Sequence, residues 1–222
     1  MNQSETKFDE IAKGVLDHYE LIEPRLAFIR HNDNVTYRVT TANSKAYLLR
    51  IHIPITSAIG THGADYGMVN SEVTWMLALA KDTNLTIPKP KRNRSGELVT
   101  RIRSKDGIPI NSTLLSWIAG EPYHKGLESK ETAYRIGLLL ATLHNQASQW
   151  NYPAGFIRPR RDVAYFENML KAIHPAVADG RISQADYAEL SISVGLLIEL
   201  MSGLDENPDH RFFILCAGEL YV

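Results

Sequence analysis

The chain has 222 residues, of which 44% are hydrophobic and 22% are charged, and its formal net charge is -1. This length is enough for one large domain or two lobes, and the near-neutral charge gives no electrostatic reason to expect nucleic acid or an anionic membrane as a partner. The single cysteine, Cys216, excludes a disulfide scaffold, and since the sequence shows neither a leader pattern nor an apolar run of membrane-spanning length, we expect a cytoplasmic protein.

The first part of the chain predicts a helix followed by an antiparallel sheet. Apolar residues recur at three- and four-residue spacing behind Ser4, which would be the N-cap of an amphipathic helix that Pro24 ends. The turn-forming pair Asn43-Ser44 separates two segments rich in β-branched and aromatic residues. The same composition predicts five strands in this part of the chain, near residues 26–29, 35–41, 46–53, 98–103 and 113–118.

A glycine-containing connection follows the third strand. It holds Gly60, Gly63 and Gly67 and leads into a helix near residues 69–81 that carries one apolar stripe. These glycines could form a phosphate cradle. A mobile strand-to-helix connection explains them better, because no strand immediately precedes the first glycine and no lysine follows the last.

After residue 122 the pattern becomes helical. A long helix that ends near Trp150 is apolar on more than one side, which suits the middle of a bundle. Two further helices are predicted near residues 162–178 and 184–201, the second with Ser183 as its cap. The apolar run at residues 212–217 predicts a buried strand.

Three segments of the first half could together bind a nucleotide. The turn within residues 31–39 would cover the phosphates, with Asn32 and Asn34 supplying the tight geometry because asparagine tolerates a positive φ. Arg50 on the third strand would be the cation that contacts the phosphates, and Glu72 on the next helix would hold it. Each residue has an alternative reading, since an arginine at a strand end is often a surface residue and the helix dipole favours a glutamate in a first turn. The three segments follow one another in the order of the corresponding parts of a kinase, and this resemblance favours the nucleotide site.

Several motifs then make the comparison with a known family specific. They are Asn34 with Tyr37-Arg38-Val39, Tyr47-Leu48-Leu49-Arg50, Ser71-Glu72, Ile87-Pro88-Lys89-Pro90, Ser116-Trp117-Ile118-Ala119-Gly120-Glu121-Pro122 and Ile136-Gly137-Leu138-Leu139-Leu140-Ala141-Thr142-Leu143-His144. Together they resemble the aminoglycoside phosphotransferase, choline kinase and homoserine kinase-like family, over residues 8 to 200. The resemblance implies a protein-kinase-like α+β fold with two lobes: an N-terminal five-stranded antiparallel lobe at residues 1–118 and an incomplete helical C-terminal lobe at residues 119–222.

The same resemblance implies an ATP-dependent kinase that acts on a small-molecule hydroxyl. In that family's arrangement Arg50 is the phosphate-contacting cation, Glu72 pairs with it, and the backbone of Ser116 and Trp117 is the hinge that hydrogen-bonds adenine. The family's enzymes also have a His-x-Asp loop followed by an Asn, and later an Asp that binds Mg²⁺. Neither motif follows the long helix here, apart from a faint echo in residues 214–222. The sequence thus assigns no catalytic residue and no metal ligand.

We therefore expect a chain that is cut short or altered near its end, that binds ATP weakly and that lacks turnover. The incomplete C-terminal lobe would leave apolar side chains uncovered and favour self-association. Two alternatives remain open at this point, a nucleotide-sensing or partner-binding pseudokinase and a non-functional fragment. The sequence does not identify the acceptor.

Overall fold

The computed structural model describes residues 3–32, 34–53, 55–57, 60–62, 65–120, 129–158 and 162–205. The chain separates into two compact units. The first contains Met1–Ile55, His62–Leu139 and Tyr152–Ile157, and the second contains Thr56–Thr61, Leu140–Asn151 and Arg158–Val222. The lobe boundary at residue 118 stays a prediction.

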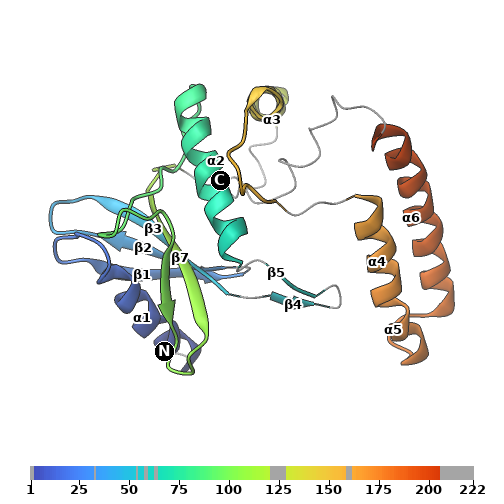
Figure 1. Ribbon diagram of the computed structural model, residues 1–222, viewed down its shortest axis with the longest axis horizontal. Helices are drawn as coiled ribbons and strands as arrows, with labels where there is room; N and C mark the ends of the chain where they lie inside the picture. The colour runs from blue at the N-terminus through green and yellow to red at the C-terminus, as the bar shows by residue number, and fades with distance from the viewer. Residues whose placement is uncertain are drawn as a thin grey trace. The chain divides into compact units, whose positions relative to one another are not determined.

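A five-stranded antiparallel sheet is the basis of the first unit (Figure 1). Its strands are β1 (Arg25–His31), β2 (Asn34–Thr40), β3 (Ala46–His52), β6 (Thr100–Arg103) and β7 (Pro109–Ser116), in the order β1-β2-β3-β7-β6. All five predicted strands are present, although the last begins at Pro109 rather than near residue 113. Side chains alternate between the two faces of a strand, so the apolar and polar residues of β2 divide between opposite faces of the sheet.

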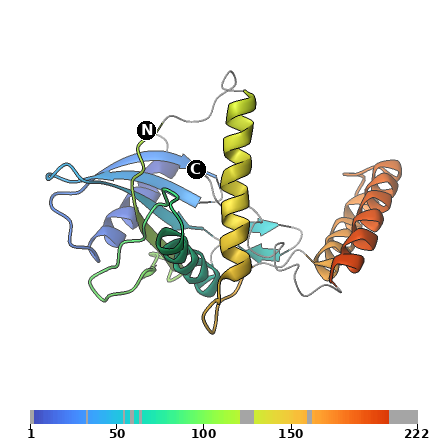
Figure 2. The same cartoon turned by 90° about the horizontal axis from the view of Figure 1, so that it is seen from above.

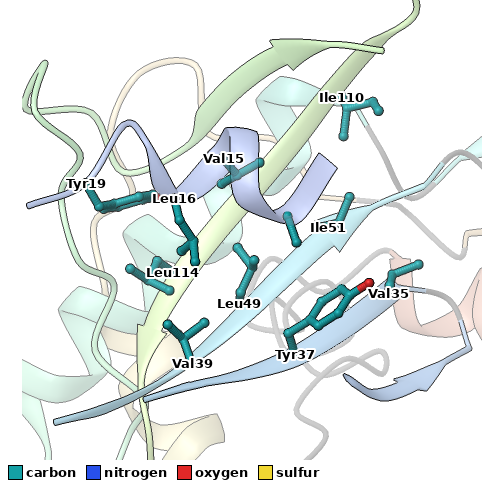
Figure 3. Close-up of a cluster of buried hydrophobic side chains, with 11 residues drawn as sticks. Val15, Leu16, Tyr19, Val35, Tyr37, Val39, Leu49, Ile51, Ile110 and Leu114 are labelled. Carbon is teal, nitrogen blue, oxygen red and sulfur yellow. The ribbon is translucent and has the colours of Figure 1, made fainter. Parts of the chain in front are cut away.

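The apolar face of the sheet packs against helix α1 (Gln3–Leu16) and the residues that follow it (Figure 3). The buried cluster consists of Ala12, Val15, Leu16, Tyr19, Val35, Tyr37, Val39, Leu49, Ile51, Ile110 and Leu114. The hydroxyl of Tyr37 donates a hydrogen bond of 2.8 Å to the carboxylate of Asp9, which joins β2 to α1. Each large apolar side chain in such a core contributes about 1.5 to 3 kcal/mol of burial.

The ends of α1 differ from the prediction. The helix already includes Gln3, so Ser4 lies inside it rather than at the N-cap. It ends at Leu16, well before Pro24. The N–H of Tyr19 donates to the carbonyl of Leu16 at 2.9 Å, a bond over three residues that tightens the last turn and places the Tyr19 ring in the core.

Helix α2 (Tyr66–Asp82) begins three residues earlier than expected. Asp65 caps it, with its carboxylate accepting from the N–H of Met68 at 3.0 Å. Gly67 therefore lies in the first turn of α2, and its placement in a mobile connection was wrong. Gly60 opens the short strand β5 (Gly60–His62), which pairs with β4 (Ile55–Ser57). Gly63 lies outside the described residues.

The segment at residues 152–157 packs against the first two turns of α2, within the same unit. The N–H of Ile157 donates to the hydroxyl of Ser71 at 2.9 Å. A Cβ atom added to Gly67 would lie 2.6 Å from Cδ1 of Ile157, which shows how closely the two segments approach. The absence of a side chain at Gly67 is what permits this approach.

Helix α3 (Lys130–Gln149) is present as predicted, and it carries exposed apolar side chains, as expected for an incomplete C-terminal lobe. The side chains of Tyr134 and Leu138 are 68% and 55% exposed. Among the described residues of α3, the buried ones are Leu143, Gln146 and Ala147. The apolar residues of this helix fall on several sides, and only one side is covered, so its prediction as the centre of a bundle is wrong for the described part of the chain.

The second unit contains α4 (Val163–Ile173), α5 (Pro175–Ala178) and α6 (Gln184–Asp205), with α4 and α6 side by side (Figure 2). The predicted helix at residues 162–178 is divided because Pro175, which has no N–H to donate, starts a new helix. Ser183 does cap α6, since its hydroxyl accepts from the N–H of Asp186 at 3.0 Å. The predicted strand at residues 212–217 lies outside the described residues. None of the described helices combines the length and apolar character needed to cross a membrane.

Candidate functional site

A buried ion pair joins the polar face of the sheet to α2. Nη1 of Arg50 on β3 lies 2.5 Å from Oε1 of Glu72, and the two side chains are only 11% and 9% exposed. Two residues that the sequence predicted to act together are therefore in contact. Because α2 begins at Tyr66, Glu72 lies in its second turn, where the helix dipole no longer explains a glutamate. The partner that does explain it is Arg50.

Polar residues from three strands surround Arg50. The strand register places Thr36 of β2 and Thr113 of β7 on either side of it. His52 lies two residues after Arg50 on β3 and on the same face. It is 2% exposed, and its Nε2 lies 3.3 Å from the hydroxyl of Thr113. Burial, with a smaller contribution from the charge of Arg50, lowers the pKa of His52 to about 3. His52 is therefore neutral near pH 7.

His52 was not identified from the sequence. The signal available was its position, since residues two apart on a strand share a face. That signal places His52 beside Arg50, but its burial depends on β7, which is distant along the chain. Local sequence patterns carry no information about such a neighbour.

The turn between β1 and β2 lies close to the Arg50 region. Asn34 is the first residue of β2 and pairs with His52 across the strands, and the N–H of Asn32 donates to the carbonyl of Asn34 at 3.2 Å. Among the described non-glycine residues, positive φ angles occur at Glu23 and Ser44. Asn32 thus closes the turn through a hydrogen bond, and the positive φ expected for it is not found.

The predicted hinge begins at the end of β7. The N–H of Ser116 donates to the carbonyl of Lys89 at 2.8 Å, and the N–H of Trp117 donates to the carbonyl of Ala46 at 3.2 Å. The hydroxyl of Ser116 accepts a further bond of 2.8 Å from the N–H of Lys89. Both hinge N–H groups are thus bonded to the protein. Adenine binding by the backbone of these two residues stays a prediction, and it would have to use their carbonyl oxygens.

A cation stacked on an aromatic ring lies beside the hinge. Cζ of Arg38, on the polar face of β2, is 4.9 Å from the centre of the Trp117 ring. Arg38 is exposed and Trp117 is half-buried. In the sequence Arg38 is recognisable only as part of a motif, and its contact with Trp117 is not predicted.

In the parts of the chain that the structure describes, no group of three His, Cys, Asp or Glu side chains is arranged to hold a metal ion. The absence of metal ligands that the sequence implies stays a prediction.

Solved structures provide a comparison for this arrangement. The chain is similar to a microcompartment-associated aminopropanol kinase, with 24% identity and a TM-score of 0.58 over 69% of this chain and 45% of that protein. It is also similar to the amicoumacin kinase hAmiN, whose structure contains AMP-PNP and Ca²⁺, with 18% identity and a TM-score of 0.60 over 77% of this chain and 49% of that protein. The chain has a protein-kinase-like fold.

This protein-kinase-like fold confirms the predicted α+β class and the resemblance at the level of the fold. The chain spans about half the length of the two structures it resembles. No family model matches the sequence, and no curated protein matches it either.

Proposed function

We propose that this chain forms the nucleotide-binding part of an ATP-dependent phosphotransferase whose acceptor is a small-molecule hydroxyl. The observation that carries the proposal is the buried pair of Arg50 and Glu72 on the polar face of a kinase-like sheet. Phosphoryl transfer depends on positioning and on charge stabilisation of the phosphates. Arg50 is a cation that the carboxylate of Glu72 holds in one place, and this meets the requirement for positioning.

Arg50 is suited to this task by its geometry. A guanidinium has five N–H donors in a fixed plane, and Nη1 of Arg50 is directed to Glu72. Because this contact fixes the rotamer of Arg50, its other N–H donors can bond phosphate oxygens without a further change of rotamer. Glu72 is in this proposal a positioning residue, because it acts on the phosphates only through Arg50.

The neighbours of Arg50 support the same role. The pKa of His52 is so low that its ring adds no second positive charge near neutral pH. Thr36 and Thr113 occupy the positions opposite Arg50 on the two adjacent strands. The turn containing Asn32 and Asn34 lies at the same end of the sheet, since Asn34 pairs with His52. Binding thus depends mainly on one charged group.

Isothermal titration calorimetry with ATP and Mg²⁺ tests this proposal on the full chain. We expect Arg50→Ala to weaken ATP binding by about tenfold or more, since hydrogen bonds between charged groups contribute about 1.5 to 3 kcal/mol. Arg50→Lys should keep part of the affinity, because the charge remains while the planar donor set is lost. Arg103→Ala is the control, because this exposed β6 arginine bonds only the carbonyl of Gly107 among the contacts described.

Two results would contradict the proposal. One is the absence of ATP binding at millimolar concentration by a chain that circular dichroism shows to be folded. The other is ATP affinity that is equal in the original chain and in Arg50→Ala.

Self-association is a separate part of the proposal. It is favoured by three exposed side chains at four-residue spacing on α6, Ile192, Leu196 and Leu200, which are 65%, 59% and 70% exposed. Such a row is apolar surface that association would remove from water. Light scattering at micromolar concentration should show a mass above that of one chain, and Leu196→Glu should reduce it. A monomer at all concentrations would contradict this part alone.

A further inference from the structure

The stacked pair of Arg38 and Trp117 is not used by the phosphate site. The guanidinium of Arg38 lies over the Trp117 indole, with Cζ 4.9 Å from the ring centre. This distance is within the range of a cation–π contact. Since Arg38 is exposed, part of its side chain remains accessible to a ligand.

The strand register fixes where this pair lies relative to Arg50. Arg38 of β2 is opposite Leu48 of β3, and Leu48 is opposite Leu115 of β7. Arg50 occupies the next row on the same face, two residues further along β3. With a rise of about 3.3 Å per residue, the rows of Leu48 and Arg50 are about 7 Å apart. That spacing is on the scale of the ribose that separates a base from its phosphates.

The row that contains Arg38 also has the right chemical character for a base. Leu48 is half-buried and Leu115 is buried, so apolar surface lies beside the exposed guanidinium. Planar guanidinium groups stack on nucleobases and on aromatic rings. The N–H groups of Ser116 and Trp117 are bonded to the protein, so these two residues offer a base no amide donor.

We propose that Arg38, held in place by Trp117, stacks on the nucleobase and makes the site prefer a nucleotide over a polyphosphate without a base. This inference rests on the proposed function, because it places the base by reference to the phosphate cation Arg50. In this inference Arg38 determines specificity at the base of the nucleotide, whereas Arg50 binds the phosphates at the other end. Stacking on a base does not require hydrogen bonds to its edge, so the preference extends to nucleotides with any base.

The test uses two ligands, ATP and inorganic tripolyphosphate, each titrated with Mg²⁺ into the full chain in a calorimeter. Arg38→Ala should weaken ATP binding by about tenfold, the size of effect known for lost base stacking, and leave tripolyphosphate binding within about twofold. Arg38→Lys should resemble Arg38→Ala, because lysine keeps the charge but has no planar group. Arg50→Ala should weaken the binding of both ligands.

Arg101→Ala is the matched control. Arg101 is also exposed and also lies over an aromatic ring, with Cζ 4.4 Å from the ring centre of Tyr66, but it is on the edge strand β6. Its removal should change neither affinity. This control separates the specific position of Arg38 from a general loss of an exposed arginine.

Three results would overturn the inference while the proposed function stands, provided that Arg50→Ala still weakens both ligands. They are an equal loss of both ligands in Arg38→Ala, full recovery in Arg38→Lys, and unchanged or tighter ATP binding in Arg38→Ala. If the folded original chain binds neither ligand, or if Arg50→Ala changes neither, the proposed function and this inference both fail.

Discussion

Replacement of His52 by glutamine should reduce the dependence of stability on pH. In the native chain His52 is buried, with a pKa lowered to about 3 from an ordinary value of 6.5. Below pH 6.5 the unfolded chain binds a proton at this residue and the folded chain does not. The stability contributed by neutral His52 is therefore complete above pH 6.5 and is lost as the pH falls from 6.5 towards 3.

The size of this effect follows from the two pKa values. Between pH 7.5 and pH 5.0 the free energy of unfolding should fall by about 2 kcal/mol because of His52 alone. This free-energy change is nearly the same for any folded pKa below about 4. The folded chain then binds almost no proton at His52 in this pH range, so protonation of the unfolded chain sets the value. His52→Gln keeps a nitrogen or oxygen near the position of Nε2 and does not titrate. It should remove this part of the pH dependence.

Urea denaturation at pH 7.5 and pH 5.0, followed by circular dichroism, measures the difference directly. The other histidines and the carboxylates titrate in both proteins, so they cancel when the two pH dependences are subtracted. An equal pH dependence in the original chain and in His52→Gln would refute the reasoning. So would an NMR titration in which the His52 ring gains its proton near pH 6.5 while the chain is folded.

The remaining predictions concern the stability of the first unit. Glu72→Ala should lower the free energy of unfolding by about 3 to 5 kcal/mol, because it leaves the Arg50 charge buried without its carboxylate. Gly67→Ala should cost about 1 to 3 kcal/mol, because the new Cβ would lie 2.6 Å from Cδ1 of Ile157, and the second change Ile157→Val should recover much of the loss. Gly14→Ala should stabilise by up to about 1 kcal/mol, since nothing lies within 4 Å of its new Cβ and alanine favours α1. Urea midpoints measure all three.

Controls make these comparisons specific. Glu131 forms an exposed pair with Arg135 at 3.8 Å, so Glu131→Ala should leave the urea midpoint nearly unchanged. A loss at Glu131 as large as that at Glu72 would show that burial does not decide the effect. If Ile157→Val fails to offset Gly67→Ala, the close approach of α2 and the segment at residues 152–157 is not the cause of the loss.

The sheet could be predicted because its strands carry their own pattern. Val35, Tyr37 and Val39 alternate with polar residues along β2, and the two faces are used as that alternation predicts. Arg50 and Glu72 could be predicted as a pair from their order on a strand and the following helix. In both cases the information lies in short stretches of sequence.

The features that were missed depend on contacts between distant segments. The start of α2 was placed too late because glycines suggested a loop, whereas Asp65 supplies a cap that extends the helix past Gly67. The hinge N–H groups are bonded to Lys89 and Ala46, which only the folded register brings to β7. Similarly, the apolar pattern of α3 shows that the helix has several apolar sides but does not show which side is covered.

These contacts connect the packing of α2 to the candidate phosphate site. Ser71 and Glu72 are neighbours in sequence; one accepts a bond from the N–H of Ile157, and the other holds Arg50. Gly67 lies one turn before Ser71 on the same side of α2. A clash at Gly67 would displace the turn that carries Glu72 and so disturb the orientation of Arg50. We therefore expect Gly67→Ala to weaken ATP binding as well as stability, although residue 67 is itself no part of the phosphate site.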